Sequence, residues 1–186
     1  MSIFLLIAAI ILWLAAIAML PGRPLLGPAM SYLGLLCLSL CSSDGISWLP
    51  INSNMLISWL AITLVVMVAT MLQPAPIRAQ ARGMMYIIAG GVVGLAIGLL
   101  GYTVTSSVSA LYGIMIIATA VGIFFGFLLY TRTPDGRQVG VMSRNFFRYL
   151  LAKGFPTAVT LMQIGLVLVL LIYTRDSHVE SVMNSL

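Results

Sequence analysis

Apolar residues form long uninterrupted stretches along this chain, and charged residues break them at only a few places. The stretches without a charged residue are 1–22, 24–43, 45–77, 83–131 and 154–174. A helix needs about 20 predominantly apolar residues to cross a membrane, so most of these stretches fit one crossing. The fourth stretch has 49 residues and would be about 74 Å long as one helix. It must fold back once, and its most polar segment, 103–107, is the expected turn.

This pattern predicts an all-α integral membrane protein, a six-transmembrane-helix bundle that forms a single polytopic membrane domain over 1–186. The spans are expected near 3–20, 28–43, 54–73, 84–103, 108–131 and 156–174. The second span is the weakest because it is short and follows two prolines, and a tilted or re-entrant segment is its alternative. The first span has a signal-peptide alternative, with cleavage near 16–18. Because no basic residue precedes its apolar core, we expect an uncleaved span.

The composition limits the possible functions and the charges predict an orientation. Hydrophobic residues make up 61% and charged residues 7%, against about 45–50% and 25% in a soluble domain, which excludes a soluble enzyme and a nucleic-acid-binding domain. Eight of the nine basic residues lie in the loops 21–27, 74–83 and 132–155, and the ninth is Arg175. Because short cytoplasmic loops are enriched in Lys and Arg, we expect these three loops to be cytoplasmic. Both termini are then non-cytoplasmic, in a multi-pass protein of a bacterial-type inner (plasma) membrane.

Glycines in two consecutive spans predict close helix packing. Five of them lie within one 100° arc of the span 84–103, at about 100° per residue; they are Gly90, Gly91, Gly94, Gly98 and Gly101. The next span carries Gly122 and Gly126 on one face. Glycine is unfavourable in a helix, and in membranes small residues allow two backbones to approach closely. Packing against 108–131 or 3–20 is therefore expected, with a subunit interface or a backbone-lined substrate path as alternatives.

The segment 142–153 between the last two spans has an amphipathic pattern. Apolar side chains, Phe146 and Phe147 among them, share one helical arc, and Arg144 and Arg148 occupy the other. We expect an interfacial helix that ends at 154–156, with its phenylalanines toward acyl chains. Its lipid-headgroup contacts are predicted to be Arg144, Arg148 and Lys153. Docking to a cytoplasmic partner and gating are the alternatives.

The predicted spans contain no Asp, Glu, Lys, Arg or His. Acid–base and metal chemistry need such groups, so we expect no catalytic residue, cofactor or metal site. A zinc site from Cys37, Cys41, Asp44 and His178 is the weak exception, because these ligands are scattered. The one long polar side chain deep in a span is Gln163. We expect its amide to hydrogen-bond a neighbouring helix, with a substrate contact as the alternative.

These observations predict a non-enzymatic protein. Its expected function is that of a permease, channel or solute-binding membrane subunit for a neutral or apolar small molecule. The alternative is a structural or assembly subunit of a larger membrane complex. Expected partners are the lipid bilayer, anionic lipid headgroups, and either further copies of the chain or other membrane subunits. A continuous polar or glycine-lined cavity among the last three spans would favour transport, whereas a solid core with an exposed small-residue face would favour a structural subunit.

Overall fold

The computed structural model describes residues 2–42, 51–75, 77, 83–105, 107–140 and 143–183, and this part of the chain is helical without any β-strand. The α-helices are α1 (Ser2–Met19), α2 (Leu26–Ser42), α3 (Ser53–Met71), α5 (Met84–Leu100), α6 (Val108–Thr131), α7 (Arg144–Tyr149) and α8 (Phe155–Met183). Short 3-10 segments occupy Gly101–Thr103 and Pro134–Val139, and a π-helical turn occupies Leu150–Gly154. The all-α prediction is confirmed for the described residues.

The predicted spans correspond to these helices, with shifts of a few residues at most ends. Within the described residues, three helices are long and apolar enough to cross a membrane, and they are Ser53–Met71, Val108–Thr131 and Asn145–Thr174. Three more apolar helices are shorter, and they are Ile3–Met19, Leu26–Leu40 and Met84–Leu100. The expected turn within 83–131 is present, because α5 ends at Leu100 and α6 begins at Val108. By length and composition, these helices suggest that the protein associates with a membrane.

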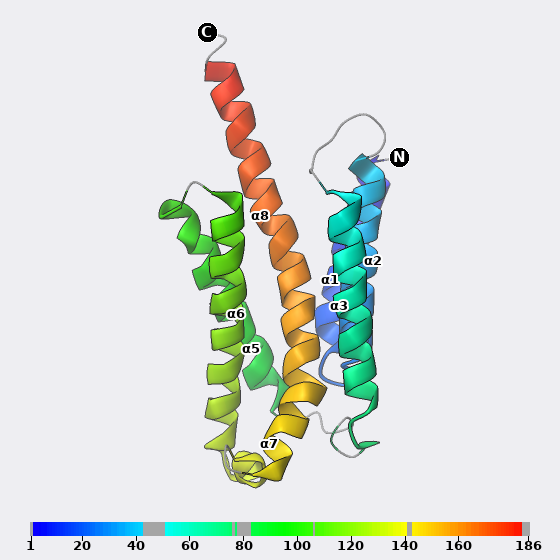
Figure 1. Cartoon of the computed structure of the whole chain (residues 1–186), viewed down its shortest axis with the longest axis vertical. Helices are drawn as coiled ribbons and strands as arrows, with labels where there is room; N and C mark the ends of the chain where they lie inside the picture. Colours follow the sequence, from blue (N-terminus) through cyan, green and yellow to red (C-terminus); the bar gives the residue numbers. More distant parts are fainter. Residues whose placement is uncertain are drawn as a thin grey trace.

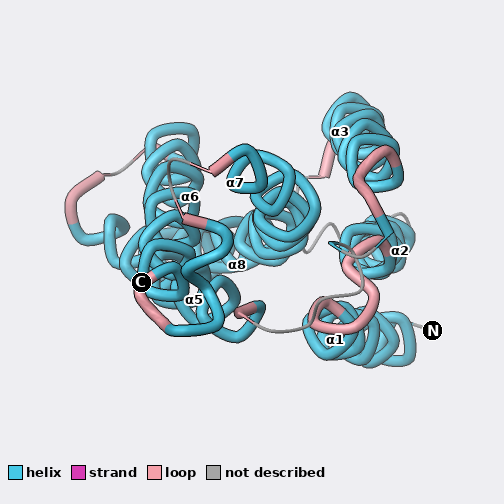
Figure 2. The backbone as a smooth tube through the Cα atoms, turned by 90° about the horizontal axis from the view of Figure 1, so that it is seen from below, coloured by secondary structure: helices cyan, strands magenta, loops and turns pink. Residues whose placement is uncertain are grey.

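Helix α8 lies between two groups of helices. Seen along the bundle, α1, α2 and α3 form a row on one side of α8, and α5 and α6 form a pair on the other (Figure 2). Both chain termini lie at one end of the molecule, and α7 lies at the opposite end (Figure 1). The connections that follow α1, α3 and α6 therefore share the end that holds α7.

The central position of α8 follows from apolar side chains that it presents to both helix groups. Leu166 and Val167 of α8 belong to a buried cluster with Leu35 of α2 and Trp59 of α3. Val169 belongs to a separate cluster that Leu95, Leu111 and Met115 of α5 and α6 complete. A helix that is hydrophobic all round is typically buried, whereas the flanking helices leave large apolar side chains on their outer faces exposed.

The predicted separate interfacial helix is wrong, because the chain stays helical from α7 into α8. Proline at 156 has no N–H to donate to the preceding turn. The π-helical turn shifts the bonding by one residue at this point, and the Phe155 N–H donates to the Leu150 carbonyl. Such π-turns accommodate a local irregularity inside an otherwise continuous helix. Gly154 and Pro156 therefore mark a bulge rather than the end of the helix that was expected there.

The side of α7 that was expected to face acyl chains packs against protein instead. Phe146 is 6% exposed, and its ring centroid lies 5.0 Å from that of Phe127 on α6 in an edge-to-face arrangement. Tyr149 stacks on Tyr130 with centroids 5.7 Å apart. Phe147, in contrast, is 68% exposed. Aromatic pairs of this geometry add to the stabilisation from burial, so they attach α7 to the end of α6.

Candidate functional site

Gln163 lies at the centre of a buried hydrogen-bond network that joins three helices. Its Nε2 donates to the Thr63 hydroxyl of α3 at 2.8 Å. Its Oε1 accepts from the Ser31 hydroxyl of α2. Thr63 in turn donates to the Trp59 carbonyl at 2.7 Å, and the Trp13 indole N–H of α1 donates to the Ser31 carbonyl at 3.3 Å. The side chains of Gln163, Ser31 and Thr63 are all buried.

This network has a structural consequence rather than a chemical one. Both polar atoms of the Gln163 amide are bonded to protein, so a solute that bonded them would first have to displace Ser31 or Thr63. Leaving a buried polar partner unsatisfied costs about 1–3 kcal/mol. The amide is thus placed to hold α8 against α2 and α3.

The glycines of α5 and α6 lie at the place where these two backbones touch. A Cβ atom at Gly90 would overlap the Gly122 carbonyl, and one at Gly94 would overlap the Ala118 carbonyl. In the reverse direction, a Cβ at Gly126 would overlap the Tyr86 carbonyl. No side chain of any size fits at these positions without moving one helix away from the other.

The five glycines of the predicted arc do not all share this role. At Gly98 an added Cβ would lie 2.6 Å from the Met115 Cα, which extends the backbone contact. At Gly91 it would meet the side chains of Leu161 on α8 and Ile123 on α6, and at Gly101 it would lie 3.1 Å from a methyl group of Ile114. The arc is therefore divided between a helix crossing with α6 and an approach to α8.

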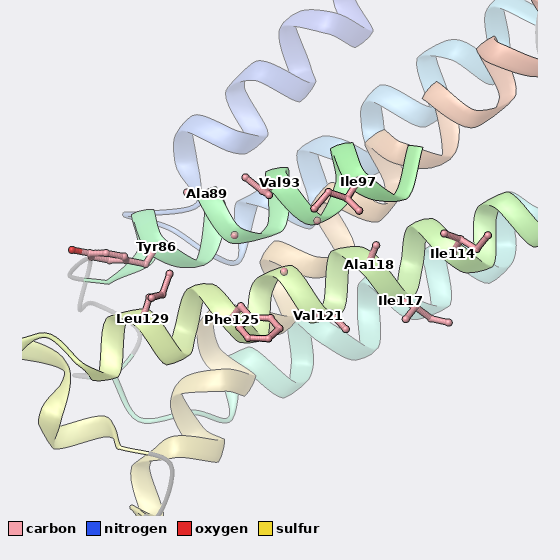
Figure 3. Close-up of a pocket in the computed structure, with 13 residues that line it drawn as sticks. Tyr86, Ala89, Val93, Ile97, Ile114, Ile117, Ala118, Val121, Phe125 and Leu129 are labelled. Carbon is pink, nitrogen blue, oxygen red and sulfur yellow. The ribbon is translucent and has the colours of Figure 1, made fainter. Parts of the chain in front are cut away.

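An apolar groove runs along the outer side of the α5–α6 crossing (Figure 3). Its volume is about 730 Å³. The small residues at its base are Ala89, Gly90, Gly94, Ala118 and Gly122, and its walls are larger apolar side chains. A volume of this size is within the range of ligand pockets, but almost no polar atom faces it.

A second apolar cleft lies where α3 and α6 flank α8. Its volume is about 380 Å³. Ile62 of α3, Phe124 of α6 and Met162 of α8 each contribute to it, and the π-helical turn closes it with Gly154. This cleft therefore opens between the two helix groups, beside the buried network of Gln163.

The three predicted headgroup contacts have different positions. Arg148 is exposed on α7. The side chain of Arg144 lies outside the described residues. Lys153 is wrong as a headgroup contact, because its side chain is 0% exposed in the π-helical turn. The helix continues past Gly154, which turns this position toward the protein.

The structure does not support the zinc alternative. In the described part of the chain, no group of three His, Cys, Asp or Glu side chains is close enough together to hold a metal ion. Cys37 is a half-buried free thiol. Asp44 and the side chains of Cys41 and His178 lie outside the described residues.

Sequence reasoning missed the partners of Gln163. Ser31 and Thr63 are short polar residues inside apolar stretches, which was their only sequence signal. Short hydroxyl side chains in helices usually bond a carbonyl one turn back, as Thr63 does here, so nothing in the pattern distinguished these two. The buried pairing of Tyr130 with Tyr149 was also missed, because Tyr130 lies near a predicted helix end and Tyr149 lies in the predicted cytoplasmic loop.

We expect the Gln163 network to behave as one unit in a double-mutant cycle. Gln163→Leu should destabilise the protein in detergent by about 1–2 kcal/mol, since interhelical hydrogen bonds in membrane proteins contribute about 0.6 to 1.7 kcal/mol. Adding Ser31→Ala should cost less than the sum of the two single changes, because the bond is already lost. Ile164→Leu, at the neighbouring position, is the near-neutral control. Strict additivity, measured by thermal or chemical unfolding, would contradict the coupling.

The α5–α6 contact is tested by a pair of glycine substitutions. Gly94→Ala should lower the unfolding free energy by about 1–3 kcal/mol, because the added methyl group meets the Ala118 carbonyl and the helices must separate. Gly113→Ala on α6 is the matched control, since nothing lies within 4 Å of a Cβ placed there. It should be neutral or stabilising, because alanine is favoured over glycine in a helix by about 1 kcal/mol. Equal melting temperatures for the two variants would rule out the backbone contact.

Comparison with known proteins gives no assignment. No family model, curated protein or solved structure matches this chain. The function is therefore inferred from the geometry of the chain's own residues.

Proposed function

We propose that this chain is a multi-pass protein of a bacterial-type inner membrane and acts as a non-catalytic structural subunit of a membrane complex. The observation that carries the proposal is the combination of a closed polar interior with apolar cavities that open sideways. The Gln163 amide is already bonded to Ser31 and Thr63. The two cavities at α5–α6 and at α3–α6–α8 are lined by apolar side chains and glycines.

The cleft beside α8 is the proposed contact site for another subunit. It lies between the two helix groups and exposes Phe155 of the central helix together with Ala120 of α6. An apolar transmembrane helix of a second protein is the occupant that fits such a cleft, because helix association in lipid relies on shape and small residues rather than on charge. The cleft carries no group that would recognise a polar solute.

A permease for a neutral or apolar solute is the second candidate. The observation in its favour is that Gly90, Gly94 and Gly122 line part of the larger groove. The groove follows α5 from Tyr86 to Ile97 and α6 from Ile114 to Leu129, which correspond to rises of about 16 Å and about 22 Å. A path across the hydrocarbon core would need about 30 Å, so the structural role has the stronger support.

The proposed topology predicts which exposed positions react with a membrane-impermeant thiol reagent. In a background with Cys37→Ala and Cys41→Ala, Val104→Cys should react from outside, because it follows α5 at the end that holds both termini. Pro134→Cys and Gly22→Cys should be protected until the membrane is permeabilised, because basic residues keep these loops cytoplasmic. Labelling of Pro134→Cys but not Val104→Cys would show the opposite orientation.

The subunit role predicts a complex of fixed composition. The tagged full chain, expressed at its native level and extracted in mild detergent, should have a mass larger than any small multiple of its own and contain other membrane subunits at constant stoichiometry. Ala120→Phe should release them by filling the cleft. Val65→Phe, on the outer face of α3, is the control and should leave the complex intact.

A permease role predicts that the chain acts without other subunits. The chain purified alone and reconstituted in liposomes should then accelerate the flux of small neutral solutes, followed by light scattering. Such flux, together with extraction as a single species that Ala120→Phe does not change, would contradict the structural role.

A further inference from the structure

The groove between α5 and α6 is lined by apolar atoms, and a phenol hydroxyl lies at one end of it. Tyr86 forms the end of its α5 wall, and the phenol oxygen lies at that end of the groove (Figure 3). On α6, Phe125 and Leu129 form the wall at the same end. Arg132 comes seven residues after Phe125, so the two lie about 20° apart around the helix. Arg132 keeps helical backbone angles and is exposed, so it extends this wall beyond the groove.

The groove covers only part of the thickness of a bilayer. Its α5 wall extends from Tyr86 to Ile97 and its α6 wall from Ile114 to Leu129, which correspond to rises of about 16 Å and about 22 Å. A hydrocarbon core is about 30 Å thick, so the groove extends from one side of the core past its middle without crossing it. Its polar end lies at the end of the molecule that holds α7 and the exposed Arg148 (Figure 1), where headgroups of the cytoplasmic leaflet are expected.

We propose that this groove binds one acyl chain of an anionic phospholipid, and that Arg132 and Tyr86 hold the headgroup phosphate. The proposal rests on the membrane location proposed above but not on the role as a complex subunit. Glycines at 90, 94 and 122 explain the depth of the groove, because the backbones that touch there leave no side chains to fill the space beside them. An arginine at headgroup level supplies the cation that an anionic phosphate requires.

A phospholipid fits these observations better than a second copy of the chain. A helix is about 10 Å in diameter with its side chains, and a partner helix would lie along the whole of α5 and α6 rather than over part of them. An acyl chain is thin enough to enter beside Val93 and Ile97, and it ends where the groove ends. The cation and phenol at the open end also have a role with a phosphate that an apolar helix would not give them.

Native mass spectrometry of the full chain in detergent tests this proposal, with phosphatidylglycerol and phosphatidylcholine of identical acyl chains as probes. The unmodified chain should retain one phosphatidylglycerol in preference to phosphatidylcholine. Val93→Phe should lower the occupancy of both lipids, because the ring fills the groove from an exposed position. The neighbouring Val92→Phe is the matched control, since Val92 is exposed but does not line the groove. Ile97→Phe provides a second block, and the melting temperature of each variant reports that it is folded.

The headgroup contact has its own pair of variants. Arg132→Gln should reduce the preference for phosphatidylglycerol about fivefold, the effect expected of one basic residue next to an anionic lipid. Arg137→Gln is the control, because Arg137 is exposed at the same end but lies beyond the α6 wall.

Three results would overturn the proposal. The first is that folded Val93→Phe and Ile97→Phe retain the lipid occupancy of the unmodified chain. The second is that Arg132→Gln and Arg137→Gln reduce the lipid preference equally, which would indicate only a general electrostatic effect. The third is a dimer that Val93→Phe converts to monomer without a change in bound lipid, which would assign the groove to a second copy. The opposite thiol-labelling pattern, in contrast, would contradict the proposed membrane topology rather than the lipid site.

Discussion

The arrangement of this protein depends on the burial of one helix, α8, between two groups of helices that scarcely meet without it. Apolar packing supplies most of this contact, through Val167 toward α2 and α3 and Val169 toward α5 and α6. Apolar packing alone does not select a unique register along a helix. The Gln163 amide selects the register, because its two ends must reach Ser31 and Thr63 together. A shift of one turn would leave both ends of this buried amide without those partners, whereas Ser31 and Thr63 would keep their bonds to the Pro28 and Trp59 carbonyls.

The α5–α6 pair obeys a different constraint. Here the contact is made by backbone, and Gly90 and Gly94 of α5 face Gly122 and Ala118 of α6 with no room for a further methyl group. Dispersion contacts at this distance are individually small but numerous, and they need no hydrogen bond between side chains. The same glycines create the groove. Gly90, Gly94 and Gly122 also line its base, and because they have no side chains, the space beside the contact stays open.

The helices, and the turn between α5 and α6, were predictable from sequence. The lengths of the apolar stretches and the positions of the charges can be read from the sequence alone, without knowing which helices pack together. The sequence shows that the glycines of α5 share one face of the helix. Which of them contact α6 and which contact α8 depends on how the helices cross, and the sequence does not show this. Lys153 was misplaced because Gly154 and Pro156 suggested a helix end, whereas a π-helical turn continues the helix at that point. Phe146 was misplaced because its contact with Phe127 depends on how α7 packs against α6. The pairing of Gln163 with Ser31 and Thr63 depends on which helices become neighbours, which no local pattern specifies.

The π-helical turn connects these features to one another. Just before this turn, Phe146 and Tyr149 lie against Phe127 and Tyr130 of α6. Slightly more than two helical turns after α8 begins, Gln163 bonds α2 and α3. The aromatic contacts at the base of α6 and the amide bonds to α2 and α3 are therefore two ends of one helical segment, with no loop between them to absorb a displacement. Because that segment is rigid, the α1–α3 row and the α5–α6 pair are held in a fixed relation, and the cleft between them keeps its shape. A preformed apolar cleft on a rigid support is what a structural subunit requires, because its partner then needs to supply only a complementary surface.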